Sequence, residues 1–181
     1  MVELRYPIVE DAELFFRILT EGNFQYYYAT IPESIELERE WIKRREHKRE
    51  NNLEYNYSII YSNALVGGCN IRIYRDSPHV GELGYFIDKN YFNKGIVTEA
   101  VKELEKIAFE KLGLIRLEIR MDPRNKASEK VAIKNGFIKE GLLKKVLKFN
   151  DDYFDNLLYA KVSELKGGDK FGQTGDSHIR A

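Results

Sequence analysis

The feature that most constrains the fold is a change in the spacing of apolar residues near residue 89. Before it, residues 55–61, 65–74 and 80–88 alternate apolar and polar side chains, as strands do, and residues 62–64 form a hairpin turn. After a turn-rich stretch at residues 89–95, apolar residues recur on one helical face, at Ala100, Val101, Leu104, Ala108 and Leu112. We therefore expect an antiparallel meander followed directly by an amphipathic helix, which Gly113 ends.

Further elements lie on both sides of this unit. Residues 2–6 predict a strand, and Pro7 precedes a helix with apolar positions at Ala12, Phe15, Phe16 and Leu19. Ser34 is the expected N-cap of a long charged helix that ends near Asn51, with anchors at Leu37, Trp41 and Ile42. We interpret its charge run, residues 43–50, as a solvated face. A strand at 115–121, a short helix at 127–135 and strands at 137–147 and 154–162 complete the chain.

This order of elements predicts an α/β fold with one mixed, mostly antiparallel sheet and helices on both faces. The length of 181 residues suits one domain. We assign residues 1–166 to it and residues 167–181 to a glycine-rich C-terminal tail without periodicity. In a homodimer, that tail could pack against the partner subunit.

Composition narrows the functional classes. Lys plus Arg and Asp plus Glu both total 29, so no net charge attracts nucleic acid or an anionic membrane. Cys69 is the single cysteine, which rules out an internal disulfide. The three histidines show no metal-ligand spacing, so we expect no metal. Because no apolar stretch is long enough for a signal or a membrane span, we expect a cytoplasmic protein.

The loop before the amphipathic helix is the strongest candidate for a binding site. Backbone N–H groups at a helix N-terminus favour a phosphate, and Gly95 would let the backbone approach one closely. Thr98 could add a hydroxyl donor in the first turn. The alternative is that Gly95 belongs to a simple connection, since the loop lacks the signatures of a P-loop or a dinucleotide fold.

Several segments resemble one family in order and spacing. Residues 81–88 and 91–100 resemble the acetyl-CoA motif of the GNAT N-acetyltransferases, and most of all their RimJ/RimL-like branch. Residues 125–128 and 135–141 match that branch's N-x-x-S and G-F-x-x-E-G signatures. The likeness covers about residues 2–162. It implies the GNAT fold and an enzyme that uses acetyl-CoA as cosubstrate.

The resemblance also implies where acetyl-CoA binds. The pyrophosphate would lie on the loop, the pantetheine arm would pair with the strand before it, Asn125 would bind the pantetheine, and Ser128 would lie near the thioester sulfur. The implied cofactor residues are Tyr85, Phe86, Ile87, Asn93, Lys94, Gly95, Ile96, Val97, Thr98, Asn125 and Ser128. Three residues depart from the family pattern. Phe92 and Val97 replace the usual loop residues, and Ala132 replaces a tyrosine that often serves as general acid.

Amide formation requires removal of a proton from the amine, polarisation of the carbonyl and protonation of the thiolate. Glu82 is the candidate base, and its alternative role is an ion pair with Arg72. Backbone N–H groups near Tyr85 and Phe86 are candidates for polarising the carbonyl. Ser128 is the candidate for protonating the thiolate, with a helix cap as the alternative, and Asn125 could be an ordinary turn former.

The sequence leaves the acceptor open. Aromatic residues at 24 and 26–28 fall where this fold binds acceptors, although core packing explains them equally well. We expect a primary amine as acceptor, with a protein N-terminus favoured. A polyamine, amino sugar or drug is the second possibility, and a non-catalytic binding module is the third.

Overall fold

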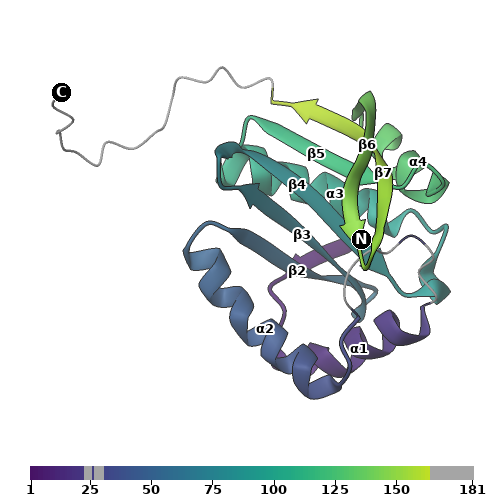
Figure 1. Ribbon diagram of the computed structural model, residues 1–181. Coiled ribbons are helices and arrows are strands. Elements are labelled where there is room, and N and C mark those ends of the chain that lie inside the picture. The colour runs from purple at the N-terminus through teal and green to yellow at the C-terminus, as the bar shows by residue number, and fades with distance from the viewer. Residues whose placement is uncertain (23–25, 27–30, 164–181) are drawn as a thin grey trace, which may run out of the picture.

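Seven strands form one sheet in the order β1-β2-β3-β4-β5-β7-β6, and this computed structural model describes residues 1–22, 26 and 31–163 (Figure 1). All neighbouring strands are antiparallel except β4 and β5, which are parallel. The expected mixed, mostly antiparallel sheet is confirmed. The strands are β1 Val2–Arg5, β2 Glu54–Tyr61, β3 Ala64–Tyr74, β4 Ser77–Ile87, β5 Arg116–Met121, β6 Ile138–Phe149 and β7 Asp152–Val162.

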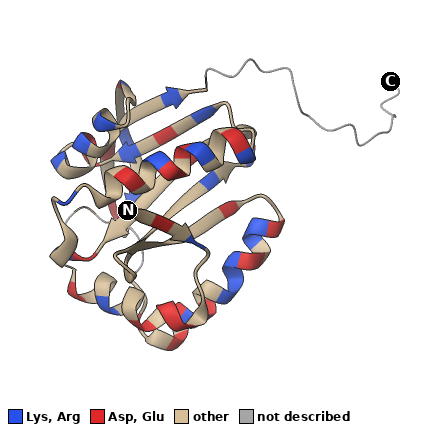
Figure 2. Cartoon of the chain, turned by 180° about the vertical axis from the view of Figure 1, so that it is seen from behind, with Lys and Arg blue, Asp and Glu red and all other residues tan. Residues whose placement is uncertain are grey.

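Helices cover both faces of this sheet, as expected. Helices α1 (Ala12–Glu21) and α2 (Ile35–Glu50) lie against the β1–β4 half, and α3 (Ile96–Lys106) crosses the opposite face (Figures 1 and 2). Helix α3 continues as a π-helical turn, Ile107–Lys111, and Gly113 follows with a φ of 67°, a conformation that favours glycine. Helix α4 (Lys126–Lys134) lies between β5 and β6 in the chain.

Two groups of buried side chains follow from the alternation along the strands. The larger core joins the sheet to α3 and includes Ile59, Ile71, Leu104, Leu117 and Ile119. The smaller core joins α1 to α2 through Phe15 and Ile42. Strand β4 contributes to both, because Leu83 and Ile87 pack in the larger core while Phe86 packs against the smaller one. Consecutive residues of β4 therefore face opposite layers.

Helix α2 differs in part from expectation. Ser34 is its N-cap, as predicted, and accepts a hydrogen bond from the Leu37 amide at 3.2 Å. Leu37 is not a core anchor, because half of it is exposed. The buried residues of α2 are Glu38, Ile42 and Arg45, so the charged helix is not solvated all round. Figure 2 shows the mixed charges along its outer side.

Two further expectations concern the ends and loops of the chain. The tail at residues 167–181 and the aromatic residues Phe24, Tyr27 and Tyr28 lie outside the described residues. The domain boundary at residue 166 therefore stays a prediction. No helix within residues 1–22 and 31–163 is long and apolar enough to cross a membrane.

Candidate active site

Strands β4 and β5 diverge in the middle of the sheet. Their register pairs are Val80 with Arg116, Gly81 with Leu117 and Glu82 with Glu118. Beyond Glu82 and Glu118 the pairing stops, although β4 runs on to Ile87 and β5 to Met121. A split sheet of this kind leaves room for an extended ligand to lie along β4, in the way that an added strand would.

The loop predicted to bind phosphate follows β4 after a short 3-10 turn, Lys89–Tyr91, and leads into α3. Gly95 is the N-cap of α3 with a φ of 78°, and Asn93 also has a positive φ, of 61°. Gly95 has no side chain with which to cap this helix end, in contrast to Ser34 and Asn125, which cap α2 and α4. A Cβ atom added at Gly95 would meet no atom of the described residues within 4 Å. The first N–H groups of α3 are therefore accessible to an anion.

The structure gives a physical reason for the unusual residue at position 97. Val97 is half-buried and packs against the larger core, so its side chain contributes to the attachment of α3 to the sheet. Phe92, the other departure, is about half exposed. Lys94 lies over the ring of Tyr91, with its Nζ atom 4.8 Å from the ring centroid.

Tyr85 and Ser128 form a hydroxyl pair between β4 and α4. Their oxygens lie 2.7 Å apart, and either group can donate. Burial raises the pKa of Tyr85 to about 12, so its phenol keeps its proton near neutral pH. Ser128 is not the helix cap, since that position belongs to Asn125, whose Oδ1 accepts from the Ser128 amide at 3.0 Å. Asn125 thus caps α4, and its amide Nδ2 has no hydrogen-bond partner among the described residues.

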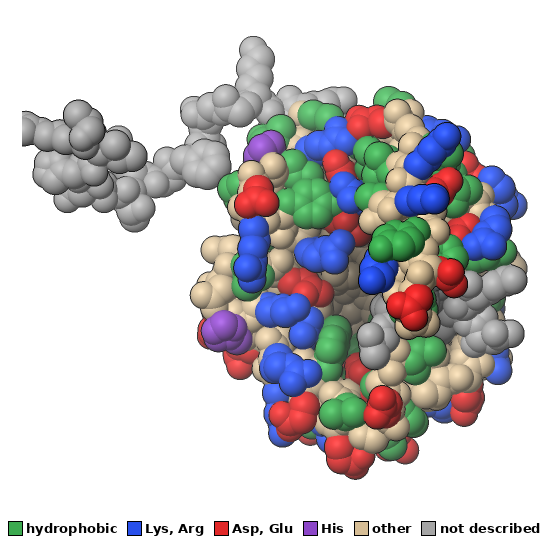
Figure 3. Space-filling view, viewed as in Figure 1, with side chains coloured by type: hydrophobic (Ala, Val, Ile, Leu, Met, Phe, Trp, Pro, Cys, Tyr) green, Lys and Arg blue, Asp and Glu red, His purple; other side chains and the backbone are tan. Residues whose placement is uncertain are grey.

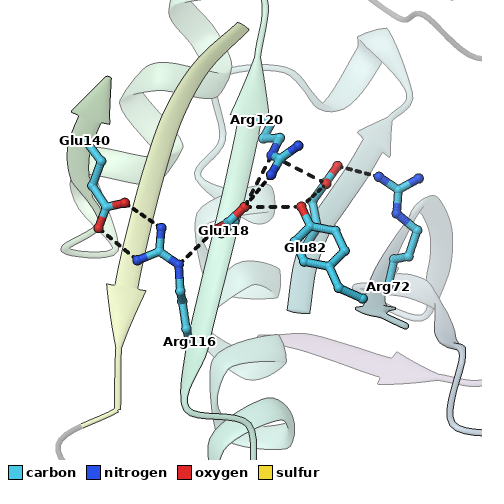
Figure 4. Close-up of polar contacts among 7 residues, drawn as sticks. Arg72, Glu82, Arg116, Glu118, Arg120 and Glu140 are labelled. Atoms are coloured by element: carbon cyan, nitrogen blue, oxygen red, sulfur yellow. Dashed lines mark hydrogen bonds and ion pairs between the residues drawn. The ribbon is translucent and has the colours of Figure 1, made fainter. Parts of the chain in front are cut away.

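Glu82 lies in a line of charged side chains across β3, β4 and β5 (Figure 4). Its carboxylate accepts from Arg72 at 2.9 Å and from the Tyr74 hydroxyl at 2.5 Å. The ion pair with Arg72, weighed as the alternative to a catalytic role, is therefore present. Burial and then the bond to Glu82 raise the pKa of Tyr74, which keeps this donor protonated.

The same line continues on β5. Glu118 accepts from Arg116 at 2.8 Å and from Arg120 at 2.9 Å, and Arg116 also binds Glu140 on β6 (Figure 4). Burial opposes ionisation of Glu118, but these arginine hydrogen bonds outweigh it and lower its pKa. Ala132, by contrast, is fully buried and offers no acid–base group.

A cavity of about 650 Å³ lies between α1, α2 and the sheet. It reaches Gly84, Tyr85 and Phe86 of β4, at the point where β4 leaves β5. Figure 3 shows this face hollowed, with side chains of both charges around the hollow. Among the residues that line the cavity are Phe15, Leu19, Leu37, Glu38, Trp41, Glu54 and Asn56. The sequence did not single out Glu38, Glu54 or Asn56, since nothing local distinguishes them from surface polar residues.

The remaining sequence candidates are the aromatic cluster, the cysteine and possible metal ligands. Tyr26 is the described member of the aromatic cluster, and the Arg124 guanidinium lies 5.2 Å from its ring centroid. Cys69 is buried, and burial raises the pKa of its thiol, which agrees with a packing role. The described residues contain no cluster of three or more His, Cys, Asp or Glu side chains suited to a metal.

Comparisons with known proteins agree with this geometry. The family profile of the acetyltransferase (GNAT) domain matches residues 2–138. The chain is 35% identical over 130 residues to the "Probable N-acetyltransferase YjcK" of Bacillus subtilis, covering 70% of this chain and 72% of that protein. It is 31% identical over 106 residues to the ribosomal-protein-serine acetyltransferase of Escherichia coli, covering 59% of each.

A solved acetyltransferase structure also resembles this chain. The microcin C7 self-immunity acetyltransferase MccE, in complex with acetyl-CoA and AMP, superimposes with a TM-score of 0.80 at 25% identity. The match covers 90% of this chain and 92% of that one.

Proposed function

The chain belongs to the GNAT family of acetyltransferases, and on that premise we propose that it transfers the acetyl group of acetyl-CoA to the N-terminal amine of a protein. The observation that carries the proposal is the divergence of β4 and β5 beside an uncapped N-terminus of α3. The hydroxyl pair Tyr85–Ser128 and the cavity that reaches β4 lie at the same split.

The residues present fit acetyl-CoA. The open space at Gly95 and the N–H groups of residues 96–98 suit a pyrophosphate, and residues 93–98 form the proposed phosphate loop. Residues 85–87 of β4 would bind the pantetheine arm along the split, and the Nδ2 group of Asn125 would donate to it. Val97 stays compatible with this arrangement because its side chain packs against the core.

The chain's own groups can supply the acid–base chemistry. Glu82 is the proposed base, which takes a proton from the amine directly or through water. The amine nitrogen then forms a bond to the acetyl carbon while the carbon–sulfur bond breaks. Ser128 would pass a proton to the leaving thiolate and regain one from Tyr85, whose hydroxyl lies 2.7 Å away. The second proton that the nitrogen loses on amide formation would return to Tyr85 through water. This pair would take the place of the family's tyrosine, which is Ala132 here.

Besides a protein N-terminus as acceptor, the alternatives are a small amine and a non-catalytic role. The likeness to a ribosomal-protein-serine acetyltransferase supports a protein substrate. The similarity to MccE, whose structure contains AMP, favours a small amine as the second candidate. A non-catalytic binding module is the third candidate function. The Tyr85–Ser128 pair and the open α3 terminus argue against it, because a protein that had lost its catalytic activity would not be expected to keep both features.

Isothermal titration with acetyl-CoA and, separately, with desulfo-CoA tests the cofactor assignment. Binding of both is expected, because the proposed contacts involve the pyrophosphate and the pantetheine rather than the sulfur. Absence of binding by either would refute the transferase proposal and favour the non-catalytic module.

Acceptor class is then tested by release of the CoA thiol. We expect turnover with peptides that carry a free α-amine and none with the same peptides blocked at the N-terminus. Turnover with spermidine or glucosamine, but not with any free peptide, would replace the protein substrate by a small amine.

A further inference from the structure

Two buried side chains in the large cavity carry acceptor oxygens that have no hydrogen-bond partner among the described residues. Glu38 on α2 and Asn56 on β2 both line the cavity, and each is only 5% exposed. The Asn56 amide Nδ2 donates to Glu54 at 2.9 Å, which fixes its orientation and leaves the buried Oδ1 without a donor. Among the described residues, Glu38 has no hydrogen bond and no ion pair within 4.0 Å. Its nearest influence is the positive charge of Arg45.

In contrast to Glu38, the neighbouring carboxylate of Glu54 has several hydrogen-bond donors. Glu54 accepts from Arg45 at 3.2 Å, Lys48 at 2.8 Å, Asn56 at 2.9 Å and Asn70 at 3.3 Å. Arg45 is therefore committed to Glu54, and its guanidinium also lies 4.2 Å from the Trp41 ring centroid. Among the described residues, the cations of this region thus pair with Glu54, and Glu38 keeps only the longer-range attraction of Arg45.

A buried acceptor without a donor is unfavourable, and a buried carboxylate without a cation is more so. Since both open groups are acceptors and one is an acid, the ligand that satisfies them must present several N–H donors and a positive charge. Arg44 and Glu33 are the other charged residues that line the cavity, and both are exposed. A primary ammonium meets these requirements.

We propose that Glu38 and Asn56 form the ammonium subsite for the acceptor of acetyl transfer. The group attached to the nitrogen would pack against the apolar wall made by Phe15, Leu19 and Trp41. The substrate class is thus a primary amine on an apolar or aromatic residue, held as its cation before Glu82 takes the proton. This inference rests on the proposed function, because it treats the cavity that reaches β4 as the acceptor site.

Trp41 makes the subsite directly measurable, because it is the single tryptophan of the chain and lines the cavity. Its fluorescence is followed while the CoA-loaded protein is titrated with phenethylammonium or with 2-phenylethanol, which has the same ring but no charge. We expect the ammonium to bind at least about tenfold more tightly, as a charge-assisted hydrogen bond implies.

The variant Glu38→Gln should abolish this preference and keep the fold, because the side chains have the same shape. Glu36→Gln is the matched control, since Glu36 lies in the same first helical turn but is exposed and pairs with Arg39. It should keep the preference. An unchanged preference in Glu38→Gln, or its loss in both variants, would overturn the assignment.

A second measurement needs no substitution. N,N,N-Trimethylphenethylammonium keeps the charge but has no N–H donor, so it should bind the natural protein about tenfold more weakly than the primary ammonium. Equal binding of the two cations, or of ammonium and alcohol, would refute the subsite. Acetyl-CoA titration separates the two hypotheses: normal acetyl-CoA binding without ammonium preference removes only the subsite, whereas no acetyl-CoA binding removes the proposed function.

Discussion

A substitution at Gly95 tests the proposed phosphate loop, and the structure allows its effect on folding to be separated from its effect on binding. Gly95 has a φ of 78°, so an alanine there costs roughly 1–2 kcal/mol of conformational strain. Within the part of the chain that the structure describes, the added Cβ would meet no atom within 4 Å. The folded protein can therefore accommodate the methyl group, and the melting temperature should fall by about 2–8 °C.

Gly113 provides a matched control beyond the other end of the same helical segment. It has a φ of 67° and also has no atom within 4 Å of an added Cβ. Gly113→Ala should therefore lose about the same stability as Gly95→Ala. Only Gly95 lies in the proposed phosphate loop, where a Cβ would hold the pyrophosphate away from the backbone N–H groups.

Acetyl-CoA affinity, measured by isothermal titration, should fall about tenfold or more in Gly95→Ala and stay unchanged in Gly113→Ala. Gly95→Asp should cost more. A carboxylate about 4 Å from one phosphate charge costs ~4 kcal/mol at an effective dielectric of 20, or roughly a thousandfold in affinity. Equal acetyl-CoA affinity in Gly95→Asp and the unsubstituted protein would refute the loop assignment.

Three further predictions concern the acid–base groups. Tyr85→Phe should lower kcat by roughly 10²-fold with little change in KM for acetyl-CoA, whereas a packing defect alone would raise KM, and steady-state kinetics distinguish the two. Glu82→Gln should lower turnover most at low pH, where more of the amine is protonated; a pH–rate profile like that of the natural enzyme would remove Glu82 from the mechanism. Burial raises the pKa of Glu38, so its ionisation destabilises the fold as the pH rises above about 4.5. Thermal unfolding should therefore show that Glu38→Gln gains stability relative to the natural protein between pH 4.5 and 7. A stability difference that stays constant with pH would contradict this.

The elements with a clear period could be predicted from the sequence. Strands β2, β3 and β4 alternate because one layer of side chains meets α3 and the other meets α1 and α2. Helix α3 is predictable for the same reason, as its buried residues recur on one face. The loop at Gly95 followed from its place between a strand and this helix, and its left-handed φ explains why glycine is there.

Helix α2 shows where such reasoning fails. It has no apolar stripe, because its buried face carries Glu38 and Arg45 beside Ile42. A charged residue buried by tertiary contacts has the same local sequence signal as one in water, so neither the position of Glu38 nor the cavity could be inferred. The bond between Tyr85 and Ser128, 43 residues apart in the chain, likewise depends on how α4 packs beside β4.

The charged line at the split explains why Glu82 can be both a structural and a catalytic residue. Glu82 and Glu118 are the last register pair before β4 and β5 diverge, so two carboxylates lie side by side on parallel strands. Their repulsion is countered by arginines on both sides and by the Tyr74 hydroxyl, which lies 2.5 Å from Glu82 and 3.2 Å from Glu118. Removing the Glu82 side chain altogether would take from Arg72 its ion-pair partner at 2.9 Å, whereas Arg120 would keep Glu118. Glutamine keeps the size of the side chain and one acceptor oxygen, but it loses the charge and the second acceptor. A loss of turnover in Glu82→Gln that exceeds any loss of stability would therefore report on the chemistry.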